Sequence, residues 1–183
     1  QFNEYTMYKS FRGNMTFVGP RKSKYVLTKG KKNNKGKVLW FYETYTNKME
    51  LAFDFQIYDK KSGTVGAHDE KSGNGLAFVF YQGDALYQGA RPYGEQRGVI
   101  TNGTGFSVHF QVKGERALLI KDGNGVIVAQ EAVSGIYTHD SWATARISIH
   151  RDLLMCYINN KLILWHDLRM LNNLNLGRKH KGI

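Results

Sequence analysis

The sequence predicts an all-β sandwich in a single domain over residues 1–183. Three observations carry this prediction. The 20 glycines far outnumber the 2 prolines, and short apolar runs alternate with polar turn segments, which is typical of many short strands. The chain is 42% hydrophobic and 13% aromatic, enough for a sizeable core. No apolar run reaches the ~20 residues that a membrane-spanning helix needs.

The first third of the chain is predicted to hold an edge strand, a hairpin and a half-exposed strand. Residues 15–18 fit the edge strand. Residues 25–28 and 38–42 are rich in apolar and aromatic side chains, and the polar loop between them predicts that they pair as a hairpin. Residues 49–58 alternate apolar with polar side chains, the pattern of a strand with one face buried.

Residues 73–81 join a glycine-rich turn to the most apolar strand of the chain. Leu76, Phe78 and Phe80 fall on one face, and the other face is also apolar, which predicts a strand covered on both sides. The glycines before the strand allow a sharp turn that presents Asn74 at a sheet end. We expect function to lie beside this strand and in the polar loops 60–75 and 82–97.

Six further strands are expected in the second half of the chain. They cover residues 105–112, 116–121, 126–130, 143–150, 153–158 and 161–165. The run DGNG at 122–125 is a strong hairpin signal, and RD at 151–152 and NN at 159–160 mark the next two turns. Residues 168–176 invite a helical interpretation, but their asparagines argue against a long helix.

Two further features of the composition bear on chemistry. The single cysteine, Cys156, excludes an internal disulfide, and its apolar neighbours Leu154 and Ile158 predict a buried thiol. Lysine and arginine number 26 against 15 acidic residues, a net charge of +11 that favours anionic partners. The charge clusters at residues 21–24, 29–37 and 178–181, as anion contacts or as solvated loops. No RNP-like, zinc-finger or helix-turn-helix pattern accompanies it, which argues against nucleic acid.

Several short motifs occur in an order that resembles the L-type lectin domain, the legume-like or concanavalin A-like family. They are FRGN at 11–14, YVLT at 25–28, GKVLW at 36–40, GNGLAF at 73–78, GVITN at 98–102, FSVHF at 106–110 and ARISI at 145–149. The resemblance is strongest over residues 11–165 and leaves 166–183 as a basic C-terminal segment. It implies a concanavalin A-like jelly-roll sandwich of two antiparallel sheets, with a sugar held in a shallow site by loops at one end.

The resemblance also implies a carbohydrate site around Asn74, which stands where the family has a sugar-binding aspartate. The candidate residues are Asn74, Gly75, Tyr81, Asp84, Arg91, Tyr93, Gly98 and Asn102. An amide both donates and accepts hydrogen bonds, and aromatic and guanidinium groups suit sugar rings or anionic substituents. For the aromatic and arginine candidates, a packing or solvated role is equally open.

The sequence departs from the family at the metal site. The strand that carries a glutamate and an aspartate in the family has His109 and Gln111 here. Calcium takes about six to eight oxygen ligands, several of them from carboxylates, and the run KGER at 113–116 offers room for one. We therefore expect no metal and no cofactor, and a sugar site formed without them.

No catalytic residues are expected. Glu50 and Asp54 share a strand face about 13 Å apart, at ~3.3 Å per residue, beyond the ~5 to 9.5 Å between paired carboxylates in glycoside hydrolysis. His139 and His166 each precede an aspartate, but successive strand residues point to opposite faces, so neither forms a dyad. No GxSxG or HExxH motif occurs. The sequence therefore predicts a binding protein, not an enzyme.

Three functions remain open at this point. The first is a metal-independent lectin-like module that binds a carbohydrate or glycoprotein. The second is a structural or protein-interaction domain of a larger assembly that does not bind sugar, with basic loops on anionic partners. The third is a basic protein that binds a sulfated or otherwise anionic glycan, or nucleic acid, with a steep salt dependence. The lysines that would contact such a glycan are Lys29, Lys31, Lys32, Lys35 and Lys37.

The cellular location is indicated only by short signals. The chain begins at Gln1 without a charged-then-apolar leader, as either a processed protein or an expressed fragment would, so its start does not indicate a location. Sequons begin at Asn14 and Asn102. These sequons predict a secreted, luminal or cell-surface protein.

Overall fold

The structure is a computed structural model of the chain. It describes residues 8–13, 16–18, 24–26, 36–41, 43–45, 48–57, 75–80, 105–112, 114–136, 141–171 and 179–181. For the strands before residue 48 and for residues 179–181, only the backbone is described.

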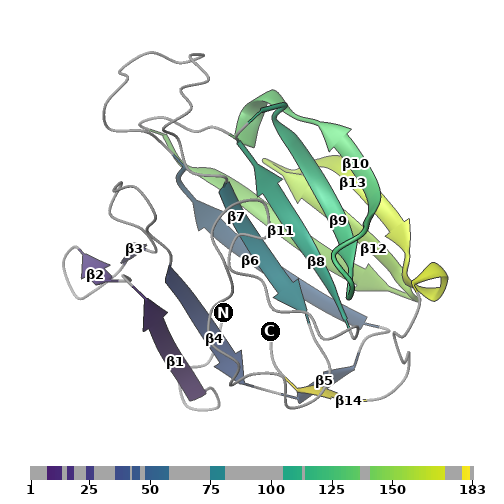
Figure 1. Cartoon of the computed structure of the whole chain (residues 1–183), viewed down its shortest axis with the longest axis horizontal. Helices are drawn as coiled ribbons and strands as arrows, with labels where there is room; N and C mark the ends of the chain where they lie inside the picture. The colour runs from purple at the N-terminus through teal and green to yellow at the C-terminus, as the bar shows by residue number, and fades with distance from the viewer. Residues whose placement is uncertain are drawn as a thin grey trace.

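The described residues form strands joined by turns, with two short 3₁₀ helices (Figure 1). The elements are β1 Tyr8–Gly13, β2 Thr16–Val18, β3 Lys24–Val26, β4 Gly36–Phe41, β5 Glu43–Tyr45, β6 Lys48–Phe55, β7 Gly75–Phe80, β8 Phe106–Gln111, β9 Ala117–Asp122, β10 Ile127–Ala132, η4 Ser134–Ile136, β11 Ala143–His150, β12 Leu153–Ile158, β13 Lys161–Asp167, η5 Leu168–Met170 and β14 Lys179–Lys181. Among these residues, no helix is both long and apolar enough to cross a membrane.

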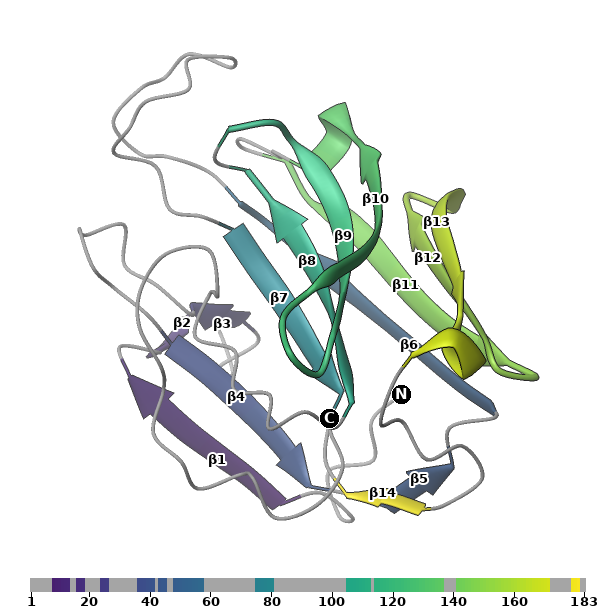
Figure 2. The ribbon, with the colours of Figure 1, turned by 45° about the vertical axis from the view of Figure 1, so that its right-hand side comes forward.

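Two four-stranded antiparallel sheets stack face to face and confirm the predicted sandwich (Figures 1 and 2). One sheet has the order β10-β9-β8-β7 and the other has the order β13-β12-β11-β6. Three two-stranded ribbons accompany them, β1 with β4, β2 with β3, and β5 with β14. The β5–β14 ribbon lies at the end of the sandwich where β6 begins (Figure 2). The start of β7 and the end of β8 lie at the opposite end.

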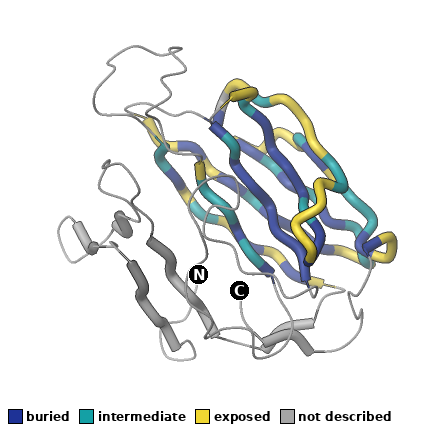
Figure 3. The backbone as a smooth tube through the Cα atoms, viewed as in Figure 1, coloured by how far each residue is buried: buried dark blue, intermediate teal, exposed yellow. Residues whose placement is uncertain are grey.

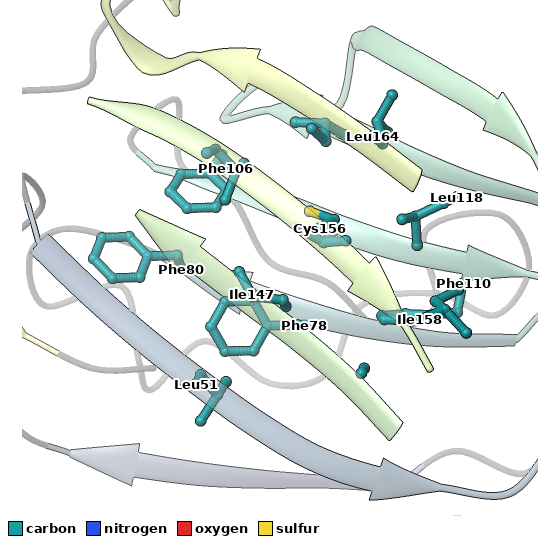
Figure 4. Packing of buried hydrophobic residues seen from close by; sticks show 14 of the residues in the cluster. Leu51, Phe78, Phe80, Phe106, Phe110, Leu118, Ile147, Cys156, Ile158 and Leu164 are labelled. Carbon is teal, nitrogen blue, oxygen red and sulfur yellow. The ribbon is translucent and has the colours of Figure 1, made fainter. Parts of the chain in front are cut away.

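The hydrophobic core fills the space between the two sheets (Figure 4). Burial is concentrated on β8, β9 and β11, the inner strands of the sheets (Figure 3). Phe80 of β7 stacks on Phe106 of β8 with ring centroids 5.1 Å apart. Phe110 of β8 packs across the sandwich against Phe55 of β6, also at 5.1 Å. Aromatic pairs of this geometry add to the stability gained from buried area. The first pair joins two strands of one sheet, and the second holds the two sheets against each other.

The predicted face pattern of residues 49–58 is confirmed in β6. Met49, Leu51 and Phe55 are buried, whereas Glu50 and Asp54 are exposed. In β7 the inner face is buried at Phe78 and Phe80, but the second face, at residues 77 and 79, is only half-buried. The predicted coverage on both sides is therefore only partial on β7. The neighbouring β8 is buried on both faces except at Gln111.

The predicted hairpin between residues 25–28 and 38–42 is wrong. β3 pairs with β2, where Phe17 lies opposite Tyr25, and β4 pairs with β1, where Phe11 lies opposite Val38. Residues 27–35 separate β3 from β4, too many for a tight turn to impose their pairing. β1, β5 and β14 are rich in charged and polar side chains, which hid them from a prediction based on apolar runs.

The three predicted tight turns of the second half are confirmed. β9 and β10 pair across Asp122, whose Oδ1 accepts hydrogen bonds from two backbone N–H groups of the turn, each at 2.9 Å. β11 and β12 pair across residues 151–152, and β12 and β13 pair across residues 159–160. All four residues of these last two turns have positive φ, the geometry of a two-residue hairpin loop. The helical interpretation of residues 168–176 reduces to the single turn η5 within the described residues.

Candidate functional site

The end of the sheet where β7 begins is the described part of the predicted carbohydrate site. Gly75, the first residue of β7, lies opposite Gln111 of β8, which in turn lies opposite Ala117 of β9. Gly75 is exposed and has φ 124°, a conformation that residues with a Cβ rarely adopt. The chain therefore enters β7 through a backbone geometry that glycine permits, directly after Asn74 in the sequence.

Of the predicted site residues, Gly75 alone lies within the described part of the chain. The others are Asn74, Tyr81, Asp84, Arg91, Tyr93, Gly98 and Asn102, which lie outside the described residues, as do Lys29, Lys31, Lys32 and Lys35. Their roles stay predictions. β7 runs away from the Gly75 end and finishes at Phe80, about 17 Å away at ~3.3 Å per residue. The chain thus continues into residues 81–104 from the opposite end of the sheet.

A row of three polar side chains occupies the second face of β8, away from the core. Ser107, His109 and Gln111 alternate with core residues along the strand. Ser107 Oγ and His109 Nε2 form a hydrogen bond of 2.7 Å, and both residues are only 1% exposed. The Nε2 of Gln111 donates to the backbone oxygen of Glu115 at 3.0 Å. All three side chains of the row therefore make hydrogen bonds, and none of them is a carboxylate.

These residues do not fit a calcium site. Calcium prefers six to eight oxygen ligands, several of them from carboxylates. On β8 the two positions that would supply carboxylates hold an imidazole bonded to a serine and an amide that donates to a carbonyl. Among the residues that the structure describes, no three His, Cys, Asp or Glu side chains come close enough to share a metal ion.

Glu50 and Asp54 each contact a different residue of β11, as expected for two carboxylates that do not act as a catalytic pair. Glu50 and Asp54 stand on the outer face of β6, each turned to its own partner. Glu50 forms an ion pair of 3.7 Å with Arg146, and Asp54 accepts a 2.6 Å hydrogen bond from the hydroxyl of Thr144. Both partners belong to β11, so these contacts tie two strands together. The geometry favours a structural role for both acids.

The His166–Asp167 pair lies at the end of β13 and serves the local fold. Burial lowers the pKa of His166, although the neighbouring Asp167 raises it in part. Hydrogen bonds from Arg169 hold the pKa of Asp167 at about 2. Asp167 also caps η5 by accepting from the Arg169 backbone N–H at 3.0 Å. The two side chains thus have separate tasks and form no dyad.

An exposed aromatic patch lies on the outer face of the β13-β12-β11-β6 sheet and was missed by the sequence interpretation. Trp165 and Leu162 of β13 are 61% and 44% exposed. They lie opposite Met155 and Tyr157 of β12, and the guanidinium of Arg146 stacks on the Tyr157 ring at 3.7 Å. Met155 and Tyr157 occupy alternate positions of β12, facing away from the core, and this alternation is the signal in the sequence. Leu162 and Trp165 are three residues apart, because the pairing of β12 with β13 shifts register between Cys156 and Tyr157.

Comparison with solved structures identifies this architecture. The exoplasmic/lumenal domain of VIP36, bound to Ca2+ and Man3GlcNAc, matches with a TM-score of 0.64 at 11% identity, over 96% of this chain and 82% of that one. The Emp47p carbohydrate recognition domain matches at 0.66 and 18% identity, over 95% and 77% of the chains. The potassium-bound Emp46p carbohydrate recognition domain matches at 0.62 and 17%, over 95% and 78%. No family model and no curated protein matches the sequence. The likeness is one of fold: the chain has the legume-like lectin sandwich that its motifs predict.

Proposed function

We propose that the chain is a carbohydrate-binding module of the lectin kind, with its site at the sheet end where β7 begins. The observation that carries the proposal is the fold, which the chain shares with two carbohydrate recognition domains over 95% of its length. The VIP36 domain of the same fold is bound to Man3GlcNAc in one structure and to mannose in another. A neutral glycan, free or on a glycoprotein, is the ligand that this likeness supports.

Within the proposed site, Asn74 is the central hydrogen-bonding residue. It immediately precedes Gly75, and its amide supplies both donors and an acceptor for sugar hydroxyls. Asp84, Arg91, Tyr93, Gly98 and Asn102 are the further proposed contacts. Tyr81 directly follows Phe80 at the opposite end of β7, so it is left out of this site. Side chains with aromatic faces would stack on the sugar ring, and the guanidinium would bind hydroxyl or anionic groups.

The proposed binding needs no metal ion. His109 and Gln111 supply no carboxylate to the sheet end, and their nitrogen atoms are hydrogen-bonded to Ser107 and to the Glu115 carbonyl. No cofactor and no catalytic residue forms part of the proposal, because the acids of β6 are engaged with β11. A secreted, luminal or cell-surface location would suit such a module, as it does the exoplasmic/lumenal domain of VIP36.

Replacing Asn74 by alanine tests the proposed site. We expect the substitution to weaken glycan binding by about 5- to 150-fold, the effect of an unmade hydrogen bond of ~1 to 3 kcal/mol. The free energy of unfolding should change by about 0.5 kcal/mol or less, as for most surface substitutions. Asn124→Ala is the matched control, since Asn124 is an exposed asparagine in the β9–β10 turn at the other end of the same sheet. Equal affinity in the Asn74 variant and the parent would place the ligand elsewhere.

A second candidate function is a protein-interaction domain that does not bind sugar. The patch formed by exposed Leu162 and Trp165 and half-buried Met155 and Tyr157 favours it, because aromatic residues and methionine are enriched in protein interfaces. In the same experiment, the absence of any glycan bound to the parent protein would support this alternative. A third possibility is an anionic glycan on the lysines of residues 29–37, which would be released when the salt concentration rises.

A further inference from the structure

The turn that follows β8 is held in place at two points. Of this turn, residues 114–116 are described, and Gly114 has φ 75°, which residues with a Cβ rarely adopt. The backbone oxygen of Arg116 accepts a 2.8 Å hydrogen bond from the backbone N–H of Val133, which follows β10. The backbone oxygen of Glu115 accepts the 3.0 Å hydrogen bond from the side chain of Gln111. The hydrogen bond to Arg116 joins two backbone groups, whereas the hydrogen bond to Glu115 depends on the side chain of Gln111.

Gln111 is the last residue of β8 and pairs with both neighbouring strands at the sheet end. Its Cα partners are Gly75 on β7 and Ala117 on β9. The backbone of Gln111 therefore pairs with the entry of β7, where Asn74 precedes Gly75, while its side chain bonds to the 114–116 turn that leads into β9. A change in the position of Gln111 would move both segments relative to each other.

The rest of the polar row gives Gln111 a rigid base. Ser107 and His109 on the same face of β8 are 1% exposed and bonded to each other at 2.7 Å. Buried groups that are hydrogen-bonded in this way resist displacement, because breaking the bond leaves a buried polar group unpaired. Their burial also keeps them from acting as a serine–histidine pair on any substrate in solution.

We propose that Gln111 is a positioning residue, whose amide tethers the 114–116 turn to the end of β8 and so sets the shape of the sheet end without a metal ion. The effect on sugar affinity rests on the proposed function; the tether itself does not. An amide suits this task, since its N–H donates to a carbonyl and its uncharged state does not vary with pH. A glutamate of the same shape would be an acceptor only and would repel the Glu115 oxygen.

The test compares three variants of the full chain with the parent: Gln111→Ala, Gln111→Glu and the control Gln130→Ala. Gln130 is an exposed glutamine on β10 of the same sheet. The first measurement is the NMR order parameter of the backbone amides of residues 114–116, which should fall from about 0.85 to below about 0.6 in both Gln111 variants and stay unchanged in the control. The second is glycan affinity, which should weaken about tenfold in both Gln111 variants, with equal values in calcium and in EDTA.

Each outcome decides the proposal. Unchanged order parameters in Gln111→Ala would show that other contacts hold the turn and would overturn the tether. A mobile turn with full glycan affinity would overturn the positioning role. Stronger binding by the parent in calcium would show that a metal shapes the site. If the parent binds no glycan at all, the proposed function fails, and the order parameters alone then decide whether Gln111 is a tether.

Discussion

Cys156 shows how the sandwich changes the chemistry of one side chain. The thiol is 1% exposed between the sheets, and burial raises its pKa to about 12. Since the thiolate is the reactive form, only about one molecule in ten thousand is reactive at pH 8. We expect native protein to react with a thiol reagent over hours and denatured protein within seconds. Modification at the same rate in both states would contradict the buried position.

His166 makes the stability of the fold depend on pH. Its Nε2 is buried without a hydrogen-bond partner, and burial lowers its pKa from the ordinary 6.5. The unfolded chain therefore takes up a proton at higher pH than the folded chain, so stability falls as the pH drops below 6.5. Asp167 raises the pKa of His166 in part and so moderates this effect, while its carboxylate is also paired with Arg169.

Urea unfolding at pH 7.5 and pH 5.5 checks this prediction. The parent should lose more stability between the two values than His166→Gln, whose side chain does not titrate. The other histidines are the same in both proteins and cancel in the comparison. An equal loss in parent and variant would show that His166 does not titrate with folding.

At the residue scale, burial was predictable and hydrogen-bond partners were not. The position of Cys156 followed from Leu154 and Ile158, because alternation along a strand is a local property. The bond from Gln111 to the Glu115 carbonyl depends on the conformation of a turn, which the sequence does not reveal. The alternation of Ser107, His109 and Gln111 in the sequence does mark a polar face, but the pattern does not say what each group bonds.

At the element scale, the β11–β12 turn contains one residue that does not favour its backbone. Arg151 and Asp152 have φ of 47° and 67°, the left-handed region, which aspartate tolerates but which costs arginine about 1 to 2 kcal/mol. Replacing the pair by Asn-Gly should stabilise the protein by about 1 kcal/mol, because this dipeptide favours the same turn. The replacement keeps the backbone hydrogen bond that the Leu168 N–H donates to the carbonyl oxygen of residue 152, because every residue type has this carbonyl.

The next turn along the chain is the control for this prediction. Asn159 and Asn160 have φ of 50° and 65°, but asparagine tolerates this region. Asn160→Gly should therefore give a smaller gain than the Asn-Gly replacement at 151–152, measured by urea unfolding under the same conditions. A gain at residue 160 equal to that at 151–152, or none at either, would show that backbone strain is not the cause.

Strand pairings divide sharply into those that the sequence predicts and those that it does not. β9 with β10, β11 with β12, and β12 with β13 are joined by tight turns, and the turn residues predicted each pair. β1 with β4 and β5 with β14 bring together segments far apart in the chain. No local signal selects such partners, because pairing then depends on how the whole sandwich assembles.

For the whole molecule, the order of motifs predicted the fold, and the solved lectin-like structures confirm it. Individual motifs are short, and their shared order carried the prediction. The candidate site was less accessible to sequence reasoning, because most of its residues fall in the polar stretches 60–75 and 82–97 of the sequence, whose conformations alternation does not predict. Gly75 is the exception, since a glycine before an apolar strand indicates an unusual backbone.

The missing carboxylates predict that calcium does not stabilise the fold. A ligand at 100 times its dissociation constant adds about 2.7 kcal/mol. For a chain of this size, that would raise the melting temperature by roughly 5 to 11 °C. We expect a change of less than about 1 °C in calcium relative to EDTA, measured by thermal unfolding. An EDTA-reversible rise of several degrees would reveal a calcium site.

We propose that this sandwich binds a glycan without a metal ion. A glycan array in EDTA at two salt concentrations tests this proposal most directly. We predict saturable binding to neutral glycans that is the same in EDTA and in calcium and changes little when the salt concentration rises from low to physiological. Binding confined to sulfated glycans and lost at the higher salt would instead assign recognition to the basic loops. No binding to any glycan in either condition would contradict the claim.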